Sequence, residues 1–248
     1  MTRPAALSLW HDSMTDDEWG PDRPSLSGDA DADVVIVGAG YTGLWTAYYL
    51  AARDPHLRIV VVESEQVGFG ASGRNGGWCS ALLPMGLDAL ARRTSRDAAF
   101  RLQRAMNETV ADVGTVVARE GIDCHWAHGG TVSVARNAVQ LARLRDHIEH
   151  LHSYGFTDSD HRLLDAAATR ARCATTDVVG GAHTPHCAAI HPARLARGLA
   201  RAVERRGVRI VERTAATSLS PGRVDTVAGP IRAAVVVRAP AALTPRQP

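Results

Sequence analysis

The stretch DVVIVGAGYTGL, residues 33–44, decides the fold of this chain. Residues 33–37 (DVVIV) form a short β-branched run that ends at a glycine turn, a pattern that predicts a buried strand. Residues 44–53 (LWTAYYLAAR) have helical length and good helix formers, and residues 58–63 (RIVVVE) predict a second buried strand. The order strand, glycine turn, helix, strand predicts a βαβ unit with a parallel pair, and therefore an α/β fold.

The turn itself reads G-x-G-x-x-G and has a specific chemical use. Gly38 allows the tight turn, Gly40 lets a pyrophosphate approach the backbone, and Gly43 lets the helix pack on the strand. The N-terminus of the helix would then face the phosphates with unpaired N–H groups. Glu63 ends the second strand, where a carboxylate accepts hydrogen bonds from ribose hydroxyls. No arginine follows it directly, which argues against a 2′-phosphate and hence against NADP.

A second glycine-rich stretch, GFGASGRNGGW at residues 68–78, goes beyond what an NAD site needs. Small residues there let the backbone lie against a flat ring or a second face of the pyrophosphate. Arg74 can offset phosphate charge, and Asn75 can offer donors and acceptors to a ring edge. The alternative interpretation is a mobile surface loop.

The remaining pattern predicts a discontinuous domain. Residues 1–30 have no period and predict an extended leader. Helices are expected at 95–120, closed by Gly121, at about 137–153, capped by Asn137, and at 192–206. Strands are expected at 131–135, 208–211, 224–227 and 233–237. With the family resemblance given below, this order of elements implies a Rossmann-like cofactor domain of parallel-sheet type at 31–120 and 190–238, a partial α+β substrate domain at 121–189, and an irregular tail at 239–248.

Composition limits the alternatives. The chain has 248 residues, 45% hydrophobic and 22% charged, with a net charge of +2, so it predicts a globular protein with no electrostatic case for nucleic acid or an anionic membrane. The N-terminus lacks the apolar region of a signal peptide, and no apolar run is long enough to span a membrane. The four cysteines are scattered without a CxxC pair. These features predict a cytoplasmic protein with reduced thiols.

Two further groups of residues carry weaker signals. His183, His186, Cys187 and His191 are candidate zinc ligands, but their spacing fits no common zinc motif, so we expect no metal. Cys79 follows the second glycine stretch and is interpreted as a structural thiol rather than a nucleophile. The stretch CHWAHGG, with His125, Trp126 and His128, is interpreted as ordinary strand residues rather than the wall of a site.

Taken together, DVVIVGAGYTGLWTAYYLA, VVVE and GASGRNGGW resemble the FAD-dependent oxidoreductases of the D-amino-acid oxidase superfamily, in the branch of gamma-glutamylputrescine oxidase-like enzymes. SLWHDSM, GGTVSVARN and HPARLARGLARAVERRGVRIVERT also resemble that branch, so the resemblance covers most of residues 8–245. It implies FAD as the cofactor, a glutathione-reductase-type FAD-binding domain, and a backbone contact near adenine at Ala216. The cofactor-binding residues implied are Gly38, Gly40, Tyr41, Thr42, Gly43, Glu63, Gly70, Ala71, Ser72, Arg74, Asn75, Gly76, Gly77 and Ala216.

The resemblance implies a reaction and leaves its catalytic residue unknown. In this family a hydride passes from the carbon that bears the amine to the flavin, the imine hydrolyses, and dioxygen reoxidises the flavin. The expected partner is a small amine or amino acid, with no nucleic acid and no membrane, and with a homo-oligomer or a complementing chain left open. Because the family's chains continue past VVVRAPAALTP, we expect a truncated product or half of a split enzyme. A non-catalytic remnant and an NAD-dependent dehydrogenase remain as alternatives.

Overall fold

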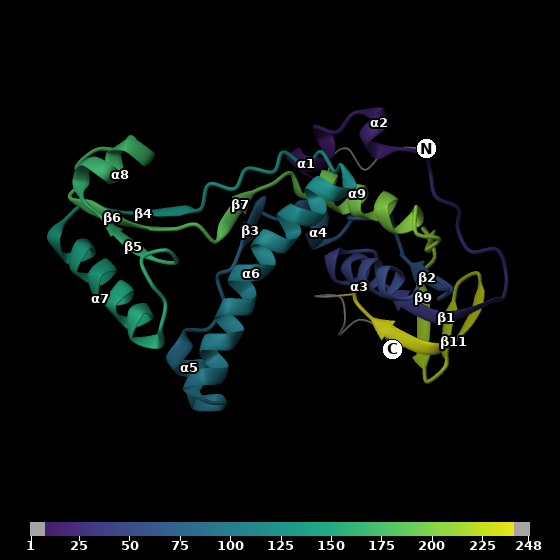
Figure 1. Cartoon of the computed structure of the whole chain (residues 1–248). Helices are drawn as coiled ribbons and strands as arrows, with labels where there is room; N and C mark the ends of the chain where they lie inside the picture. The colour runs from purple at the N-terminus through teal and green to yellow at the C-terminus, as the bar shows by residue number, and fades with distance from the viewer. Residues whose placement is uncertain (1–7, 241–248) are drawn as a thin grey trace. The chain divides into compact units, whose positions relative to one another are not determined.

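The computed structural model describes residues 8–240 and divides the chain into two compact units (Figure 1). The first unit comprises residues up to Gly77, Val117–Cys124 and the chain from His191 onward. The second comprises Trp78–Val116 and His125–Ile190. Part of the predicted tail, residues 241–248, lies outside the described residues, as do residues 1–7 of the predicted leader.

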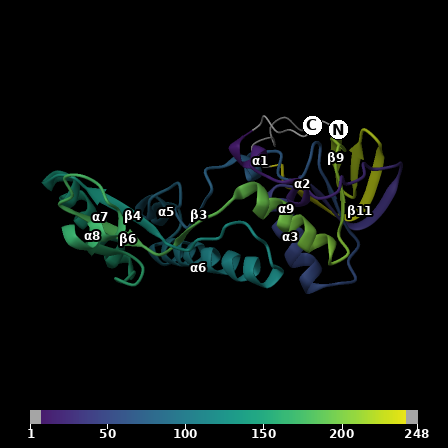
Figure 2. The same cartoon turned by 90° about the horizontal axis from the view of Figure 1, so that it is seen from above.

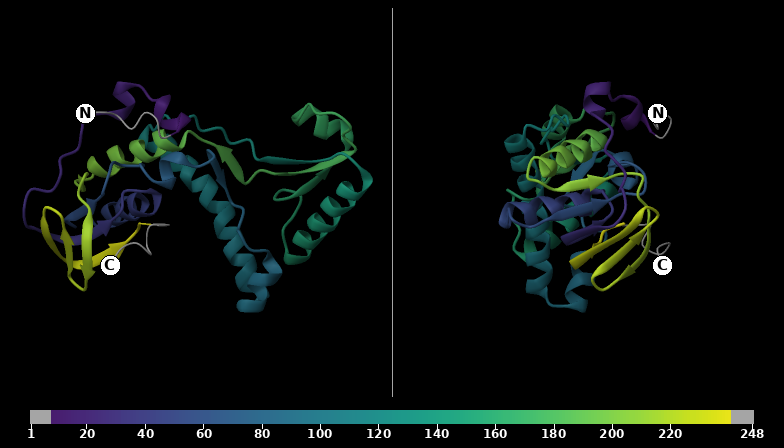
Figure 3. Two further views of the ribbon diagram at one scale, coloured as in Figure 1. Left: turned by 180° about the vertical axis from the view of Figure 1, so that it is seen from behind. Right: turned by 90° about the vertical axis from the view of Figure 1, so that its right-hand side faces the viewer.

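The first unit is built on a six-stranded sheet with the order β8-β2-β1-β11-β10-β9. Strands β8, β2, β1 and β11 run parallel to one another, and β10 and β9 continue the sheet in antiparallel fashion (Figure 3). The strands are β1 (Ala30–Val37), β2 (Ile59–Val62), β8 (Arg209–Val211), β9 (Ala216–Ser220), β10 (Arg223–Thr226) and β11 (Gly229–Arg238). The predicted α/β class with a parallel central sheet is confirmed.

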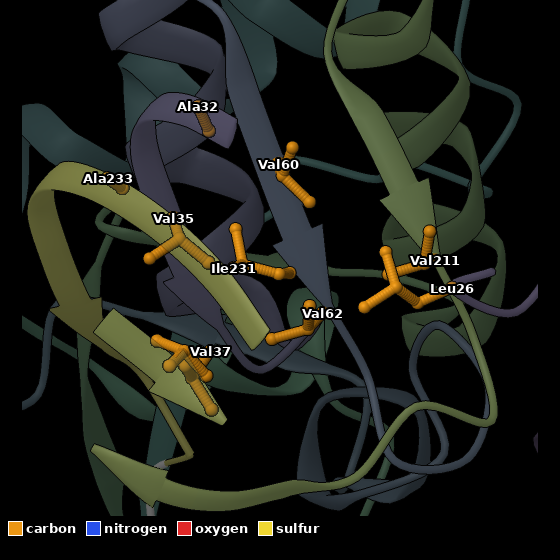
Figure 4. Packing of buried hydrophobic residues seen from close by; sticks show 10 residues of the cluster. Leu26, Ala32, Val35, Val37, Val60, Val62, Val211, Ile231 and Ala233 are labelled. Carbon is orange, nitrogen blue, oxygen red and sulfur yellow. The ribbon is translucent and has the colours of Figure 1, made fainter. Parts of the chain in front are cut away.

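Successive residues of the central strands point to opposite faces of this sheet, and both faces are buried. On one face, Val35 and Val37 of β1 lie with Val60 and Val62 of β2 in a cluster that also contains Leu26 (Figure 4). On the other face, Ile36 lies against the start of α3. A strand segment buried on both faces has no polar positions, which explains why residues 34–37 of β1 and residues 59–62 of β2 could be recognised as continuous apolar runs.

Two helices cover the face of the sheet on which Ile36 lies. Helix α3 (Tyr41–Arg53) connects β1 to β2, and α9 (Pro192–Glu204) packs beside it (Figure 2). Helix α9 begins with a proline at its first position and is capped by His191, whose ring accepts the backbone N–H of Arg194 at 3.2 Å. Both helices were predicted, and the predicted strand–helix–strand unit around residues 33–63 is confirmed.

The N-terminal segment differs from the predicted extended leader. It contains the short helices α1 (Leu9–Asp12) and α2 (Asp16–Trp19). Helix α2 starts with a capping box, in which the Thr15 side chain and the Glu18 side chain each bond the other's backbone N–H. Such a T-x-x-E signal was present in the sequence and favours a helix start. Trp19 and Met14 are buried against Ala193 of α9, so this segment is part of the first unit's core.

The second unit contains a three-stranded antiparallel sheet and a two-stranded one. In the first sheet, β6 (Gly180–Thr184) lies between β4 (Thr131–Ala135) and β5 (Arg162–Leu164); in the second, β3 (Trp78–Ser80) pairs with β7 (Cys187–Ala189). Its helices are α5 (Leu87–Arg93), most of α6 (Arg96–Glu120), α7 (Ala138–Tyr154) and α8 (Ala166–Arg172). Helix α6 and strand β4 were predicted at these positions, and Asn137 caps α7 as predicted, whereas β6 and α8 were not foreseen.

The boundaries of the two units differ from the predicted domain boundaries. Trp78–Val116 belong to the second unit, although the sequence pattern assigned them to the cofactor domain. The last turn of α6, from Val117, returns to the first unit, where Glu120 accepts a hydrogen bond from Tyr48 Oη at 2.7 Å. Among residues 8–240, no helix combines the length and the apolar character that a membrane span requires.

Candidate functional site

The first glycine turn, residues 38–43, joins β1 to α3 and is fixed by the backbone. Gly38 has φ +108°, a left-handed value that favours glycine, and its N–H donates to Val62 O at 2.8 Å. A Cβ on Gly43 would overlap the carbonyl oxygen of Gly38, so the helix can approach the strand only because residue 43 is glycine. The tight turn and the close helix packing that the motif predicted are both present.

The N-terminus of α3 opens from this turn. Gly40 is its N-cap residue, with extended backbone and no side chain to cap the helix. The N–H of Tyr41 donates instead to Ser72 Oγ at 2.8 Å, a residue from the second glycine-rich stretch. The other first-turn amides, including that of Thr42, have no acceptor within the helix. The helix therefore presents donors and the positive end of its dipole at the carboxyl edge of the sheet.

Glu63 lies beside this helix end, directly after β2. Its Oε2 accepts the Ala39 N–H at 2.8 Å, and its Oε1 accepts the Glu65 N–H at 3.1 Å and the Ser64 hydroxyl at 3.2 Å. Burial raises the pKa of the Glu63 carboxyl, while these hydrogen bonds act against that rise. The structure thus places a carboxylate next to the first glycine turn, as expected from adjacent parallel strands whose carboxyl ends share one edge.

The second glycine-rich stretch contains a second glycine turn, residues 68–73, with the same geometry as the first. Gly68 has φ +75°, Gly70 is the N-cap of the short helix α4 (Ala71–Arg74), and a Cβ on Gly73 would overlap the Gly68 carbonyl oxygen. These residues, GFGASG, also read G-x-G-x-x-G, a repeat that the sequence analysis did not recognise. The Gly68 N–H donates to Ala39 O at 3.3 Å, so the two turns are in direct contact.

Some glycines in these turns have no structural reason to be glycine. Gly70 and Gly76 have φ values open to any residue, and a Cβ on either would meet nothing within 4 Å. At Gly40 a Cβ would meet only the Ser72 side chain, 2.8 Å from its Oγ. The chain thus has no side chain at three positions where one could be accommodated or nearly so, in and beside a loop whose Ser72 Oγ accepts the first amide of α3. These residues fit a ligand that carries phosphate and approaches the backbone closely.

Arg74 and Asn75 take different roles in the structure. Arg74 is exposed, with its guanidinium carbon 5.1 Å from the Phe69 ring centroid, so its charge is available to a ligand. The Asn75 side chain is engaged within the loop, where it donates to Ser72 O at 3.0 Å and accepts the Gly77 N–H at 2.9 Å. Its amide shapes the backbone that carries Gly76, rather than pointing as a free group to a ring edge.

Ala216, at the start of β9, lies in a segment that runs beside Glu63. Two residues earlier, the Thr214 N–H donates to Glu63 O at 2.8 Å, and the Arg213 N–H donates to Glu65 O at 2.9 Å. Ala216 itself packs against the cluster that contains Val37 and Val62. The structure therefore brings most of the expected positions, from Gly38 to Gly77 together with the strand of Ala216, to one edge of one sheet.

The other candidates do not assemble into a site. Within residues 8–240, no group of three or more histidine, cysteine, aspartate or glutamate side chains is arranged to hold a metal ion. His186 bonds Asp160 through Nε2 at 3.1 Å, and Cys187 is buried. Burial raises the pKa of the Cys79 thiol to about 11, so this thiol stays protonated at neutral pH and is a poor nucleophile.

Comparison with known proteins shows the family. The sequence model of the family described as "FAD dependent oxidoreductase" matches residues 33–245. The chain belongs to this family. FAD is the cofactor of this family, and FAD carries a pyrophosphate, which the amides and glycines of the two turns fit.

Individual relatives agree with the family assignment. The chain is 36% identical over 208 residues to gamma-glutamylputrescine oxidoreductase of Escherichia coli, a match that covers 83% of this chain and 48% of that one. In fold it is similar to L-amino acid deaminase from Proteus vulgaris, with a TM-score of 0.74 and 22% identity over 93% of this chain and 59% of that one. Glycine oxidase from Geobacillus kaustophilus gives a TM-score of 0.63 and 24% identity over 85% and 55% of the two chains.

The family relationship covers most of this chain and part of its relatives. The chain spans about half the length of the curated relatives it matches, with 48%, 43% and 50% of the first three covered. Membership of the FAD-dependent oxidoreductase family is therefore shown for residues 33–245. The substrates of the relatives are properties of their full-length chains, about half of which this chain matches.

Proposed function

We propose that the two glycine turns hold the pyrophosphate of FAD at the N-terminus of α3. The observation that supports this most directly is that Gly70 and Gly76 are glycines with no conformational or packing reason to be so. Their missing side chains leave the backbone accessible in the loop whose Ser72 Oγ accepts the Tyr41 N–H at the start of α3. Arg74, exposed at the edge of the same loop, supplies positive charge toward the phosphates.

We assign the adenosine ribose to Glu63, on the far side of the first turn. Its carboxylate is already oriented by the Ala39 N–H and the Glu65 N–H, so little conformational freedom remains to be lost when ribose hydroxyls bind. Ala216 and the segment before it run beside Glu63, which supports a backbone contact near the adenine there. Ala71, Asn75 and Gly77 complete the loop: Asn75 fixes its shape through Ser72 O and the Gly77 N–H.

We propose, as the reaction, oxidation of the C–N bond of an amine or an amino acid. Bound FAD supplies a hydride acceptor for such a reaction, with dioxygen as the proposed final acceptor. The substrate class rests on the names of the relatives, a gamma-glutamylputrescine oxidoreductase, a glycine oxidase and an L-amino acid deaminase. In this proposal the first unit is the FAD-binding domain, and the second unit, with its antiparallel sheets, is part of the substrate domain.

Binding of FAD to the 248-residue chain tests the proposal, with fluorescence quenching of added FAD as the measurement. Gly76→Val should reduce the affinity at least about tenfold, because a branched side chain would fill the space the ligand needs. Gly129→Val is the matched control, since Gly129 also has open space around its Cβ position and lies in the second unit. Equal losses in both variants, or no binding by the unaltered chain, would contradict the proposed site.

The substrate class has its own test. Hydrogen peroxide release should be measured for the FAD-loaded chain over a panel of primary amines, secondary amines and amino acids. Turnover confined to amines or amino acids, with peroxide as the product, would support the proposal. Turnover of 2-hydroxy acids alone would contradict the amine assignment while leaving the FAD site intact.

A further inference from the structure

Helix α1 lies against the 68–77 loop. It packs on α4 and on α9, all within the first unit (Figure 1). Gly70 and Gly76, which leave space in this loop, are assigned above to the FAD site. The contacts of α1 with the loop have no place in that assignment and need an explanation of their own.

His11 of α1 lies beside the first residue of the loop. Its side chain is 3% exposed, and the Gly68 carbonyl is close enough to its ring to act as an acceptor that raises the pKa of the imidazole. The other ring nitrogen, Nδ1, lies 2.9 Å from the Ser8 hydroxyl. A Cβ on Gly73 would lie 3.1 Å from His11 Nε2, which shows how closely the ring approaches the turn.

Trp10, the residue before it, fixes the other end of the loop. Its indole Nε1–H donates to the Asn75 carbonyl oxygen at 2.7 Å. Asn75 in turn bonds Ser72 O and the Gly77 N–H with its side chain. The indole N–H therefore fixes the position of the Asn75–Gly76 peptide group. A Cβ on Gly76 would meet nothing within 4 Å, so this peptide group borders open space.

The contacts of Trp10 continue into the core of the unit. The His191 ring accepts the Arg194 N–H through Nδ1, so its Nε2–H is free to donate to Ser13 Oγ at 3.0 Å. The Ser13 hydroxyl donates to Trp10 O at 3.2 Å, and the indole and imidazole rings meet edge to face at 5.1 Å. Hydrogen bonds thus link His191, the N-cap of α9, to Ser13 and Ser13 to the Trp10 carbonyl, and the indole of Trp10 bonds the Asn75 carbonyl.

We propose that Trp10 and His11 are positioning residues that hold the 68–77 loop in the conformation that accepts FAD. This inference rests on the proposed function, because it takes the loop as part of the cofactor site. Neither side chain need touch the cofactor. Trp10 holds the Asn75 carbonyl and His11 lies beside the Gly68 carbonyl, so the loop whose Ser72 Oγ accepts the Tyr41 N–H is already ordered before any ligand arrives, which lowers the ordering cost of binding.

The test compares Trp10→Phe with Leu9→Ala in the 248-residue chain. Trp10→Phe keeps an aromatic ring and removes the N–H; Leu9 is in the same helix, 73% exposed, and serves as the control. Trp10→Phe should weaken FAD binding about 2- to 10-fold, the range for one hydrogen bond, and should alter the visible circular dichroism of bound flavin. Without FAD, amide hydrogen exchange should accelerate in peptides covering residues 70–77 and stay unchanged in α9.

Each outcome decides the proposal. Unchanged exchange at 70–77 in Trp10→Phe, or an equal effect in Leu9→Ala, would overturn it. Because the exchange measurement needs no cofactor, it judges the role of α1 even if the unaltered chain takes up no FAD, a result that would refute the proposed function alone. If Trp10→Phe fails to fold, Ser13→Ala removes the link from His191 to Trp10 and should produce the same local change with a smaller amplitude.

Discussion

The two glycine turns of the first unit share one geometry and differ in what supports it. In each, the first glycine has a left-handed φ, the second caps a helix with no side chain, and the third lies against the carbonyl of the first. The turn at 38–43 is continuous with a buried strand and with α3, of 13 residues. The turn at 68–73 leads into α4, of four residues, and is held by side chains from elsewhere in the sequence.

The first turn continues a central strand into a long helix, and the second depends more on distant segments. The first is fixed to the sheet through Gly38 N–H to Val62 O, and side chains of Glu63 and Ser72 accept two of its amides. Around the second, Trp10 donates to Asn75 O, His11 lies beside Gly68, and Glu212 accepts the Val67 N–H at 3.0 Å. We therefore expect the second turn to be displaced more easily than the first.

Replacing the third glycine of each turn gives the largest expected difference. Gly43→Ala should cost about 4 kcal/mol or more, because the added Cβ overlaps Gly38 O and α3 cannot move away from a core that includes the fully buried Leu44. Gly73→Ala should cost about 1–3 kcal/mol, because α4 ends after one turn and can shift. Urea denaturation of both variants measures the two free energies of unfolding. Equal costs would show that the second turn is as firmly fixed as the first.

Next in size is the effect of Glu63, which lies where the two turns meet the end of β2. Glu63→Ala should weaken FAD binding by about 1–3 kcal/mol, the loss typical of hydrogen bonds to a charged group. Glu65→Ala is the matched control, because that side chain is exposed and only its backbone N–H contacts Glu63. A fluorescence titration gives both affinities. A similar loss in the two variants would place the ribose elsewhere.

The sequence revealed the first turn because strand, turn and helix all leave local patterns there. Residues 34–37 and 59–62 are apolar on both faces, and Glu63 lies at the end of the second strand, 20 positions after Gly43. The second turn carried the same G-x-G-x-x-G pattern in residues 68–73, without a strand ending at it or a long helix following it. The family resemblance implied that the second turn contacts FAD, whereas the local sequence pattern alone predicted only a glycine-rich loop.

Other features escaped because their causes are not local. The hydrogen bond from Trp10 to Asn75 joins positions 65 residues apart, and no periodicity encodes it. Strand β6, with the sequence GGAHT, has two glycines and little apolar character, so its strand state comes from pairing with β4 and β5. The capping box of α2 can be recognised in the sequence, because Thr15 and Glu18 have the spacing of that signal. No apolar run follows it to indicate a helix, so the helix was not predicted.

The contact between the turns can be measured by a double-mutant cycle. A Cβ on Gly40 would lie 2.8 Å from Ser72 Oγ but 3.8 Å from Ser72 Cβ. Gly40→Ala should therefore destabilise the chain less when Ser72→Ala is already present, with a coupling of about 1 kcal/mol between the two sites. Additive effects on the free energy of unfolding would mean that there is no steric coupling between positions 40 and 72.

The smallest expected effect is an opposite response of the two turns to acid. Burial lowers the pKa of His11 below 6.5, with the positive charges of Arg74 and Arg197 adding to the effect and the bond to Gly68 opposing it. Stability from the neutral ring is thus present at neutral pH and is lost as the pH falls through 6.5 toward the lowered pKa. Glu63 behaves in the opposite sense: burial raises its pKa above 4.5, so its folded state gains relative stability as the pH falls through that raised value.

Hydrogen exchange at about pH 7.5 and about pH 5.5, corrected for intrinsic rates, resolves the two turns separately. Protection at residues 68–77 should fall on acidification while protection at the start of α3 stays constant or rises. His11→Gln supplies the control, because it removes the titrating ring: protection at 68–77 should then be lower at both pH values and should no longer change between them. A pH dependence that persists in His11→Gln would assign the acid sensitivity to another group and would remove His11 as the reason that the two turns differ.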